Sequence, residues 1–191
     1  MQLQHLSGQL LLATPSLQDP HFRDSVVLIC HHDAEGCMGL IINRPQEITV
    51  HDVLKDMKLP DVDSTMPSYP AEDAVVFEGG PVEPFRGFVL HDGWHVYEST
   101  MQVTPELHLT TSRDVLEELS TEDGPEHFML ILGYTGWDSG QLEQELGHND
   151  WLIIPASHHI IFQEPPEKRW SFGARSVGIN KAQLSSQIGH A

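Results

Sequence analysis

The sequence predicts an α+β fold, a single domain with a mixed, largely antiparallel β-sheet and short helices packed outside it. Short apolar runs rich in β-branched residues recur along the chain, and helical periodicity is confined to short stretches. The two do not alternate regularly, as they would in a doubly wound sheet. A turn between two early apolar runs indicates a hairpin and so favours antiparallel pairing. A chain of 191 residues suits one domain over 1–191, long enough to bury a core.

The first strands are expected at three apolar runs, Gly8–Pro15, Val26–Cys30 and Met38–Asn43. Val26–Cys30 is rich in β-branched residues, which favour strands. Asp33–Gly36 supply turn-forming residues between the second and third runs, so these two runs are expected to pair as a hairpin. Pro45 is expected to end the third strand because proline cannot donate to a β-ladder.

Two helices are expected in the same half of the chain. Asp19 and Pro20 are typical of an N-cap and a first helical position, but only a turn or two fits before the next strand. Thr49 is expected to cap a longer helix, Val50–Met57, whose apolar residues recur at helical spacing. The polar, proline-rich segment 58–73 is expected to be a flexible loop.

The C-terminal half continues this mixture. Further strands are expected at Ala74–Phe77, Gly87–His91, His95–Tyr97, Leu107–Thr110, His127–Tyr134 and Trp151–Pro155. Further helices are expected at Arg113–Leu119 after a Ser112 cap, at Gln141–Leu146 between an Asp138 or Ser139 cap and Gly147, and at Glu164–Ala174. His127–Tyr134 is the expected central strand because it contains a continuous apolar run. A polar tail is expected over 176–191.

The chain is strongly acidic, with 10 Lys and Arg against 28 Asp and Glu and a net charge of −18. Between Asp114 and Glu167 there are twelve acidic residues and no Lys or Arg. Such a surface repels phosphate backbones and anionic lipids, so direct nucleic-acid binding is not expected. Four basic residues fall in Lys168–Lys181, where a solvated helix face is expected and a small anion site is the alternative. Without a basic leader or an apolar run of about 20 residues, a cytoplasmic protein with no membrane contact is expected.

The positions of cysteine and histidine argue against a metal site. Cys30, His31, His32 and Cys37 are donors of the kind that zinc accepts. Neighbouring strand residues face opposite ways, so His31 and His32 cannot both face one ion, and His158–His159 has the same problem. Both cysteines are expected to be reduced, with a disulfide across the hairpin as the alternative. No phosphate loop or nucleophile motif is found, so no cofactor and no catalytic residue is predicted.

Three turns at strand ends carry residues suited to a ligand pocket. Arg44, a rare cation on an acidic chain, is expected either to pair with Glu47 or to reach a bound anion. The Gly79–Gly80 turn is either a backbone nest for an anion or a plain turn. Trp137 is either a plug of the core or a pocket wall. The candidate ligand-binding residues are therefore Asn43, Arg44, Gly79, Gly80, Trp137 and Gln141.

The same turns carry motifs that resemble the AlgH/YqgE family of bacterial proteins. The resemblance rests on DPHFRDSVVLICHHDAEGCMGLIINRP (19–45), FEGGPV (77–82), GYTGWDSGQLEQEL (133–146), WLIIPA (151–156) and the closing IGHA, in matching order and spacing. It implies a single α+β domain and a regulatory role, because the family is named for a proposed role in transcriptional regulation of alginate production. Cys37 and Ser139 depart from the residues that are usual there, so the resemblance supports neither a cysteine pair nor a nucleophilic serine.

Two functions follow as hypotheses. The first is a non-enzymatic cytoplasmic protein of regulatory type that acts through a protein partner or a small ligand. The alternative is an enzyme or a nucleotide- or anion-binding protein with a pocket near Asn43–Arg44, Gly79–Gly80 and Trp137–Gln141. The first is favoured because the motifs consist mainly of turn-forming residues with few ionisable groups.

Overall fold

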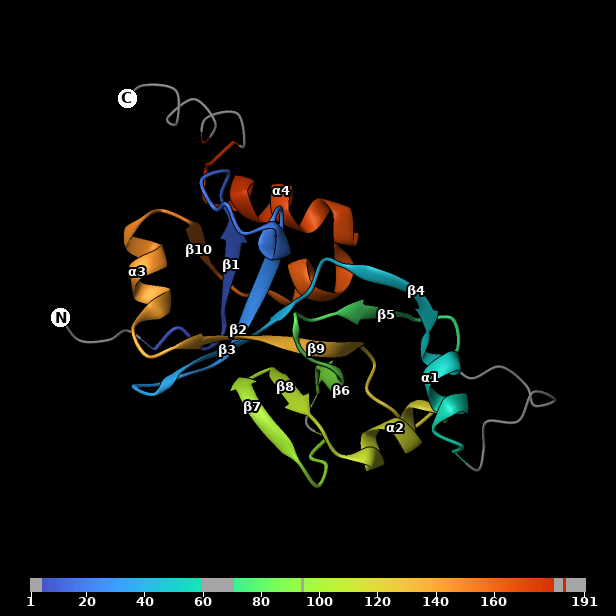
Figure 1. The fold of residues 1–191 in the computed structure, drawn as a ribbon. Coiled ribbons are helices and arrows are strands. Elements are labelled where there is room, and N and C mark those ends of the chain that lie inside the picture. Colours follow the sequence, from blue (N-terminus) through green and yellow to red (C-terminus); the bar gives the residue numbers. More distant parts are fainter. Residues whose placement is uncertain (1–4, 60–70, 94, 181–183, 185–191) are drawn as a thin grey trace.

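The computed structural model describes residues 5–59, 71–93, 95–180 and 184, and it confirms an α+β fold with a mixed, largely antiparallel sheet (Figure 1). Its strands are β1 (Gln9–Ala13), β2 (Val26–His32), β3 (Gly36–Ile41), β4 (Pro45–Thr49), β5 (Val75–Glu78), β6 (Val82–His91), β7 (Thr100–Thr104), β8 (Leu107–Thr110), β9 (Phe128–Asp138) and β10 (Trp151–Pro155). Its helical segments are the 3-10 turn η1 (Pro20–Phe22), α1 (Val50–Asp56), α2 (Arg113–Leu119), α3 (Gln141–Gly147), the π-helical turn η2 (His159–Gln163) and α4 (Pro166–Ser176). No helix within these described ranges is long and apolar enough to cross a membrane.

The strands form a single sheet in the order β10–β1–β2–β3–β9–β6–β8–β7, with antiparallel neighbours throughout. β5 adds the parallel pairing, because it runs alongside β9, and β4 pairs with β5. The predicted hairpin is formed by β2 and β3, and it places His32 opposite Cys37. The mixed sheet therefore arises from one parallel strand inserted beside the central one.

β9 crosses the centre of the molecule and joins two halves of the sheet (Figure 1). Its first part, from Phe128 to Leu132, pairs with β6, and its last part, from Thr135 to Asp138, pairs with β3. Gly133 lies between these parts with φ +76°, a conformation that residues with a side chain rarely adopt. This glycine therefore lies where β9 passes from its main pairing with β6 to its pairing with β3.

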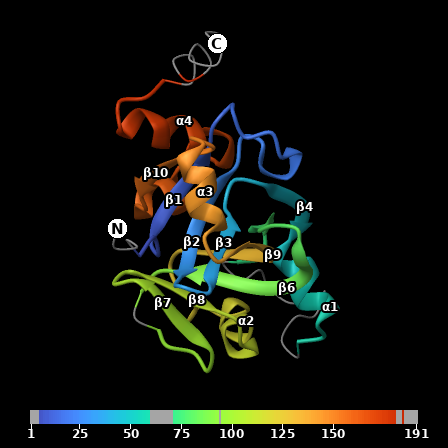
Figure 2. The ribbon, with the colours of Figure 1, turned by 60° about the vertical axis from the view of Figure 1, so that its left-hand side comes forward.

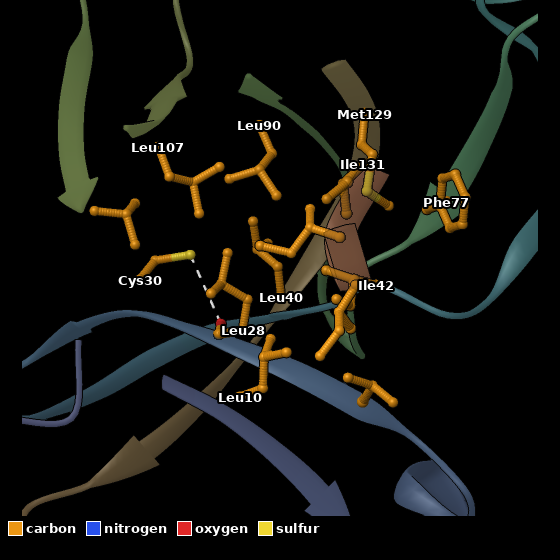
Figure 3. Close-up of a cluster of buried hydrophobic side chains, with 14 of the residues drawn as sticks. Leu10, Leu28, Cys30, Leu40, Ile42, Phe77, Leu90, Leu107, Met129 and Ile131 are labelled. Atoms are coloured by element: carbon orange, nitrogen blue, oxygen red, sulfur yellow. Dashed lines mark hydrogen bonds between the residues drawn. The ribbon is translucent and has the colours of Figure 1, made fainter. Parts of the chain in front are cut away.

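The two faces of the sheet bury separate sets of side chains. Leu10 and Leu12 of β1 belong to a central core that also includes Trp170 of α4, whereas Leu11 between them faces a second core that contains Leu142 of α3. Figure 3 shows part of the central core, in which side chains of β1, β2 and β3 lie near those of β6 and β9. Because alternate residues of a strand face opposite ways, both faces of this half carry apolar side chains.

A third core lies beneath α1 and α2, where Val50, Leu54, Val115 and Leu119 pack on the outer face of β6 and β9. Thr49 caps α1 as predicted: its hydroxyl accepts from the N–H of Asp52, and its own N–H donates to that carboxylate. Figures 1 and 2 place α1 and α2 together at one end of the molecule and α3 and α4 toward the β10–β1 end. The predicted arrangement of short helices outside the sheet is thus confirmed.

Two strand predictions need correction. Residues 95–97, predicted as a strand, lie in no strand of the described chain, and β7 forms at Thr100–Thr104 instead. The ring of Tyr97 packs in the third core, and its hydroxyl donates to Glu118 at 2.8 Å, so the apolar character of this segment reflects a single buried ring. The sequence also predicts that the chain leaves the sheet at Pro45, which is wrong because β4 forms there. Pro45 instead begins this strand, a position where proline is tolerated.

The boundaries of the last two α-helices also differ. The N-cap of α3 is Gly140 with φ +75°, whereas Asp138 ends β9 and Ser139 donates to the carbonyl of Ala34 at 2.7 Å. α4 begins at Pro166, since proline suits a first helical position.

The basic segment Lys168–Lys181 is not wholly a solvated helix face, because Arg169 is buried and donates to the carbonyls of Ile42 and Glu164. The predicted loop 58–73 and tail 176–191 lie largely outside the described residues.

Candidate functional site

The structure gives Asn43 and Arg44 partners at the end of β3. The side chain of Asn43 accepts from the N–H of Val26 at 2.8 Å and donates to the carbonyl of Asp24 at 2.9 Å. Arg44 donates to the carbonyl of Arg23 at 3.3 Å and lies 3.7 Å from the carboxylate of Glu78, so the predicted pairing with Glu47 is replaced by these contacts. Both residues thus tie the loop before β2 to the sheet.

Gly79 and Gly80 lie against the backbone of β9. An added Cβ at Gly79 would stand 2.2 Å from the carbonyl oxygen of Gly133, and one at Gly80 would stand 2.3 Å from that of Tyr134. Gly79 also donates to the Leu132 carbonyl at 2.8 Å. These glycines therefore permit close packing of two chain segments, which is a structural reason for both of them.

Trp137 is buried in the second core, with 5% of its surface exposed. Its indole N–H donates to Glu145 at 2.9 Å, and Trp151 donates to the same carboxylate oxygen at 2.7 Å. Gln141 donates to the other oxygen of Glu145 at 2.9 Å, so its amide supports this arrangement. Of the two alternatives for Trp137, the structure supports the plug of the core.

The candidate residues form two groups rather than one. Asn43, Arg44, Gly79 and Gly80 lie near the end of β3, where Ile41 donates to the Gly79 carbonyl, whereas Trp137 lies opposite Cys37 near its start. Phe22 connects the two groups, because it precedes the segment held by Asn43 and its ring stacks 6.1 Å from that of Trp137. The sequence could not show this division, since it depends on the direction of β3.

The cysteines and neighbouring histidines occupy different faces. Cys30 is in the central core and Cys37 in the second core, so no disulfide joins them. Burial raises the pKa of Cys37 to about 12 and also raises that of Cys30. His31 is exposed beside Asp33, whereas His32 is buried and bonds Glu143 at 3.0 Å. The expectation that these histidines face opposite ways is confirmed.

An apolar groove lies elsewhere, between α1, α2 and the outer face of the sheet. It encloses about 570 Å³, within the range of ligand pockets. We define it by its lining residues, which are Ile48, Asp52, Val53, Asp56, Met57, Phe85, Gly87, Val89, Thr110, Thr111, Ser112, Arg113, Leu116, Leu130 and Leu132. Residue spacing does not reveal this groove, because its walls come from four separate segments of the chain, 48–57, 85–89, 110–116 and 130–132.

Phe85 is the most unusual residue of the groove, with 94% of its surface exposed. It lies in an irregular part of β6, where the pairing with β9 shifts between Val82 and Gly87 and where Glu83 has φ +44°. A bulge of this kind redirects side chains, and here a phenyl ring is exposed on the groove wall. In the sequence, the only indication that this ring is exposed is that an apolar residue stands between charged and turn-forming neighbours.

Two of the charged residues that line the groove, Asp52 and Arg113, have partners within the fold. Hydrogen bonds from the backbone and hydroxyl of Thr49 hold the pKa of Asp52 below its usual value. Arg113 pairs with Glu117 at 3.1 Å along α2. The groove therefore combines an apolar lining with Asp52 and Arg113, which are paired within α1 and α2, and with the carboxylate of Asp56.

A cluster of histidine and carboxylate groups is the other notable feature. His127 and His158 each donate to the same oxygen of Asp92, at 2.7 and 2.9 Å. The ligand atoms of the three residues lie within 4.8 Å of one another, which suits a metal ion. Residue spacing does not reveal this cluster, because its three members come from segments that are distant in the sequence.

Comparison with known proteins gives a consistent result. The AlgH-like family model matches residues 10–182. A UPF0301 protein of Yersinia enterocolitica is 46% identical over 194 residues, covering 100% of both chains. Another from Methylococcus capsulatus is 43% identical, covering 99% of this chain and 98% of its own.

Solved structures agree with this. The solution structure of the AlgH protein from Pseudomonas aeruginosa matches with a TM-score of 0.79 and 40% identity, covering 100% of this chain and 98% of that one. A crystal structure of a Corynebacterium diphtheriae protein matches with a TM-score of 0.73 over 95% of this chain and 92% of that one, and at 21% identity it shows the shared fold alone.

Proposed function

The chain belongs to the AlgH-like family, and we propose that it is a non-enzymatic regulatory protein of the cytoplasm that binds a protein partner in the groove between α1 and α2. The observation that carries the proposal is the exposed ring of Phe85 beside an apolar groove of about 570 Å³. Exposed apolar patches next to polar residues are typical of interaction sites. Aromatic side chains are also frequent anchors of protein interfaces.

The chemistry of the groove indicates what such a partner presents. Val53, Leu116 and Leu132 line it and match an apolar segment, while Asp52 and Asp56 place carboxylates on the α1 side. The chain carries a net charge of −18, so the partner is expected to be basic around its apolar residues. Complementary charge of this kind speeds association and fixes orientation more than it adds affinity.

The contents of the groove support binding rather than catalysis. Among its described lining residues, Asp52 is held by the cap of α1 and Arg113 by Glu117. A catalytic site normally brings an accessible nucleophile and a base into hydrogen-bond contact. Of the lining hydroxyls that bond such a group, Thr110 is buried against His91, and Ser112 donates to Asp114 at the start of α2. Asn43, Arg44, Gly79 and Gly80, proposed for the alternative enzyme or anion site, make the structural contacts described above. The binding function is therefore the better supported of the two.

A photo-crosslinker in place of Phe85 tests the proposal in native cells. We expect position 85 to give a discrete covalent adduct with one protein. Val96 offers a matched control, because it is 78% exposed but does not line the groove. The same adducts from both positions, or none from position 85, would contradict the proposal. Mass spectrometry under native conditions that finds a retained small molecule, lost on Leu116→Glu, would instead identify a small ligand as the occupant.

A further inference from the structure

We propose that Asp92, His127 and His158 form a binding site for a divalent transition-metal ion of the zinc type. The three residues come from the end of β6, the start of β9 and the turn before η2. β6 and β9 are paired with His91 opposite Phe128, so Asp92 and His127 are brought together by the register of the sheet. The backbone adds two links, since Asp92 donates to the carbonyl of His127 and His127 donates to the Asp92 carboxylate, both at 3.1 Å.

The two imidazole nitrogens converge on one carboxylate oxygen. Nδ1 of His127 and Nε2 of His158 lie 2.7 and 2.9 Å from the same carboxylate oxygen of Asp92. Donors around a four-coordinate zinc ion lie about 3.3 Å apart, given metal–ligand distances of about 2.0–2.2 Å. The carboxylate would therefore turn away from the line of the two hydrogen bonds to admit an ion between the three donors. Two imidazoles and one carboxylate form a ligand set typical of zinc and iron(II).

The imidazole rings are held in place by their surroundings. The rings of His127 and His158 are nearly perpendicular, at 83°, with centroids 4.6 Å apart. Phe162 of η2 packs against both, at centroid distances of 5.8 and 5.0 Å. An apolar neighbour on one side orients metal-binding imidazoles and lowers the local dielectric. The site is thus preorganised before an ion binds.

The site borders a hollow that contains further donor groups. Asp92 and His158 line a space of about 490 Å³ together with Glu106 and His108. The buried Nδ1 atom of His108 has no hydrogen-bond partner within the described chain. A buried polar atom without a partner is uncommon in a native protein, and this one belongs to a residue that lines the same hollow. An ion held by three protein ligands would keep its remaining positions toward this space, as exchangeable zinc sites do.

The sequence predicts no metal site, whereas the fold brings three possible ligands together. His158 and His159 do face different ways, as neighbours should: His159 bonds Gln163 and Glu164, whereas His158 turns to Asp92. The partners of His158 come from other segments, which residue spacing cannot show. The cluster shares no lining residue with the groove, so the two proposals are independent.

Calorimetric titration of untagged, chelator-treated protein with Zn²⁺ tests the site. We expect one ion to bind per chain, and His127→Gln and His158→Gln each to weaken binding by at least about tenfold. His159→Gln is the matched control, because this histidine also bonds a carboxylate but lies outside the cluster, and it should leave the affinity unchanged. No saturable one-to-one binding, or an equal loss with His159→Gln, would overturn the proposal.

Two further measurements do not depend on the variants. The melting temperature of the parent chain should rise with Zn²⁺ and return when a chelator is added, because a ligand that binds the folded state stabilises it. In imidazole NMR spectra, the signals of His127 and His158 should shift first at substoichiometric Zn²⁺. Shifts spread evenly over the 13 histidines would show surface binding only and would overturn the proposal.

Discussion

One carboxylate organises the aromatic residues around the second core. Glu145 accepts hydrogen bonds from Trp137 and Trp151, and Phe22 packs against both indoles at 6.1 and 5.6 Å. A buried indole N–H needs a partner, and Glu145 supplies one for two rings at once. The motif residues around Trp137 therefore have a structural role. Their spacing indicated a plug or a wall, but the choice depended on Trp151, which only the fold brings near.

Trp137→Ala should destabilise the protein far more than Arg44→Ala. Truncating a buried tryptophan typically costs about 3–5 kcal/mol, a large share of a total stability of about 5–15 kcal/mol. Arg44 is partly exposed, with contacts of 3.3 and 3.7 Å, and exposed pairs contribute about 0–1 kcal/mol. Urea unfolding of the two variants and the parent measures the order. If Trp137→Ala unfolds like the parent yet loses a partner, Trp137 is a binding residue instead.

At the level of elements, the packing of the Gly79–Gly80 turn against β9 is the tightest constraint in this part of the fold. Gly80 has φ +149°, and a Cβ there would lie 2.3 to 2.7 Å from backbone atoms of Tyr134 and Thr135. Backbone atoms cannot turn aside as the end of a flexible side chain can. The sequence pointed to this turn, but it could not show that a second strand closes on it.

Gly80→Ala should therefore lower stability substantially. Strain at such a position costs about 1–3 kcal/mol, and displacement of β9 adds to it. Gly147→Ala is the control, because a Cβ there meets nothing within 4 Å and the residue lies in α3, where alanine is favoured by about 0.5–1 kcal/mol. The melting temperatures of the two variants, each compared with that of the parent protein, test this prediction. A Gly80→Ala protein as stable as Gly147→Ala would show that this turn is free to move.

Strands with regular apolar patterning were predictable, and irregular ones were not. β1, β2, β8 and β10 follow from short apolar runs, and α1 follows from its cap and spacing. β4 begins with a proline, and the first half of β6 is exposed and bulged, so neither has the alternation that marks a strand. The groove depends on that bulge, which is why the sequence did not reveal it.

At the level of the whole molecule, the charge follows from composition, whereas the two candidate sites follow from the topology of the fold. Composition predicts an acidic surface directly, whereas the groove and the Asp92 cluster arise from contacts between distant segments. His158, for example, bonds a residue 66 positions away, and Trp137 lies opposite Cys37 across β3 and β9. The sequence allowed candidate residues on turns to be named. Which of them lie close together depends on the direction of each strand, which the sequence does not give.

The acidic chain leads to a final prediction about nucleic acids. With a net charge of −18, the protein should bind duplex DNA no more tightly than ordinary non-specific complexes, whose dissociation constants are about 10⁻⁴–10⁻⁶ M at physiological salt. Any signal at low salt should fall steeply as salt is added, because backbone contacts release counterions. Fluorescence polarisation with labelled duplexes across a salt series measures this. Sequence-specific binding at nanomolar concentration and physiological salt would contradict it, and regulation would then act on DNA directly instead of through the partner that we propose for the groove.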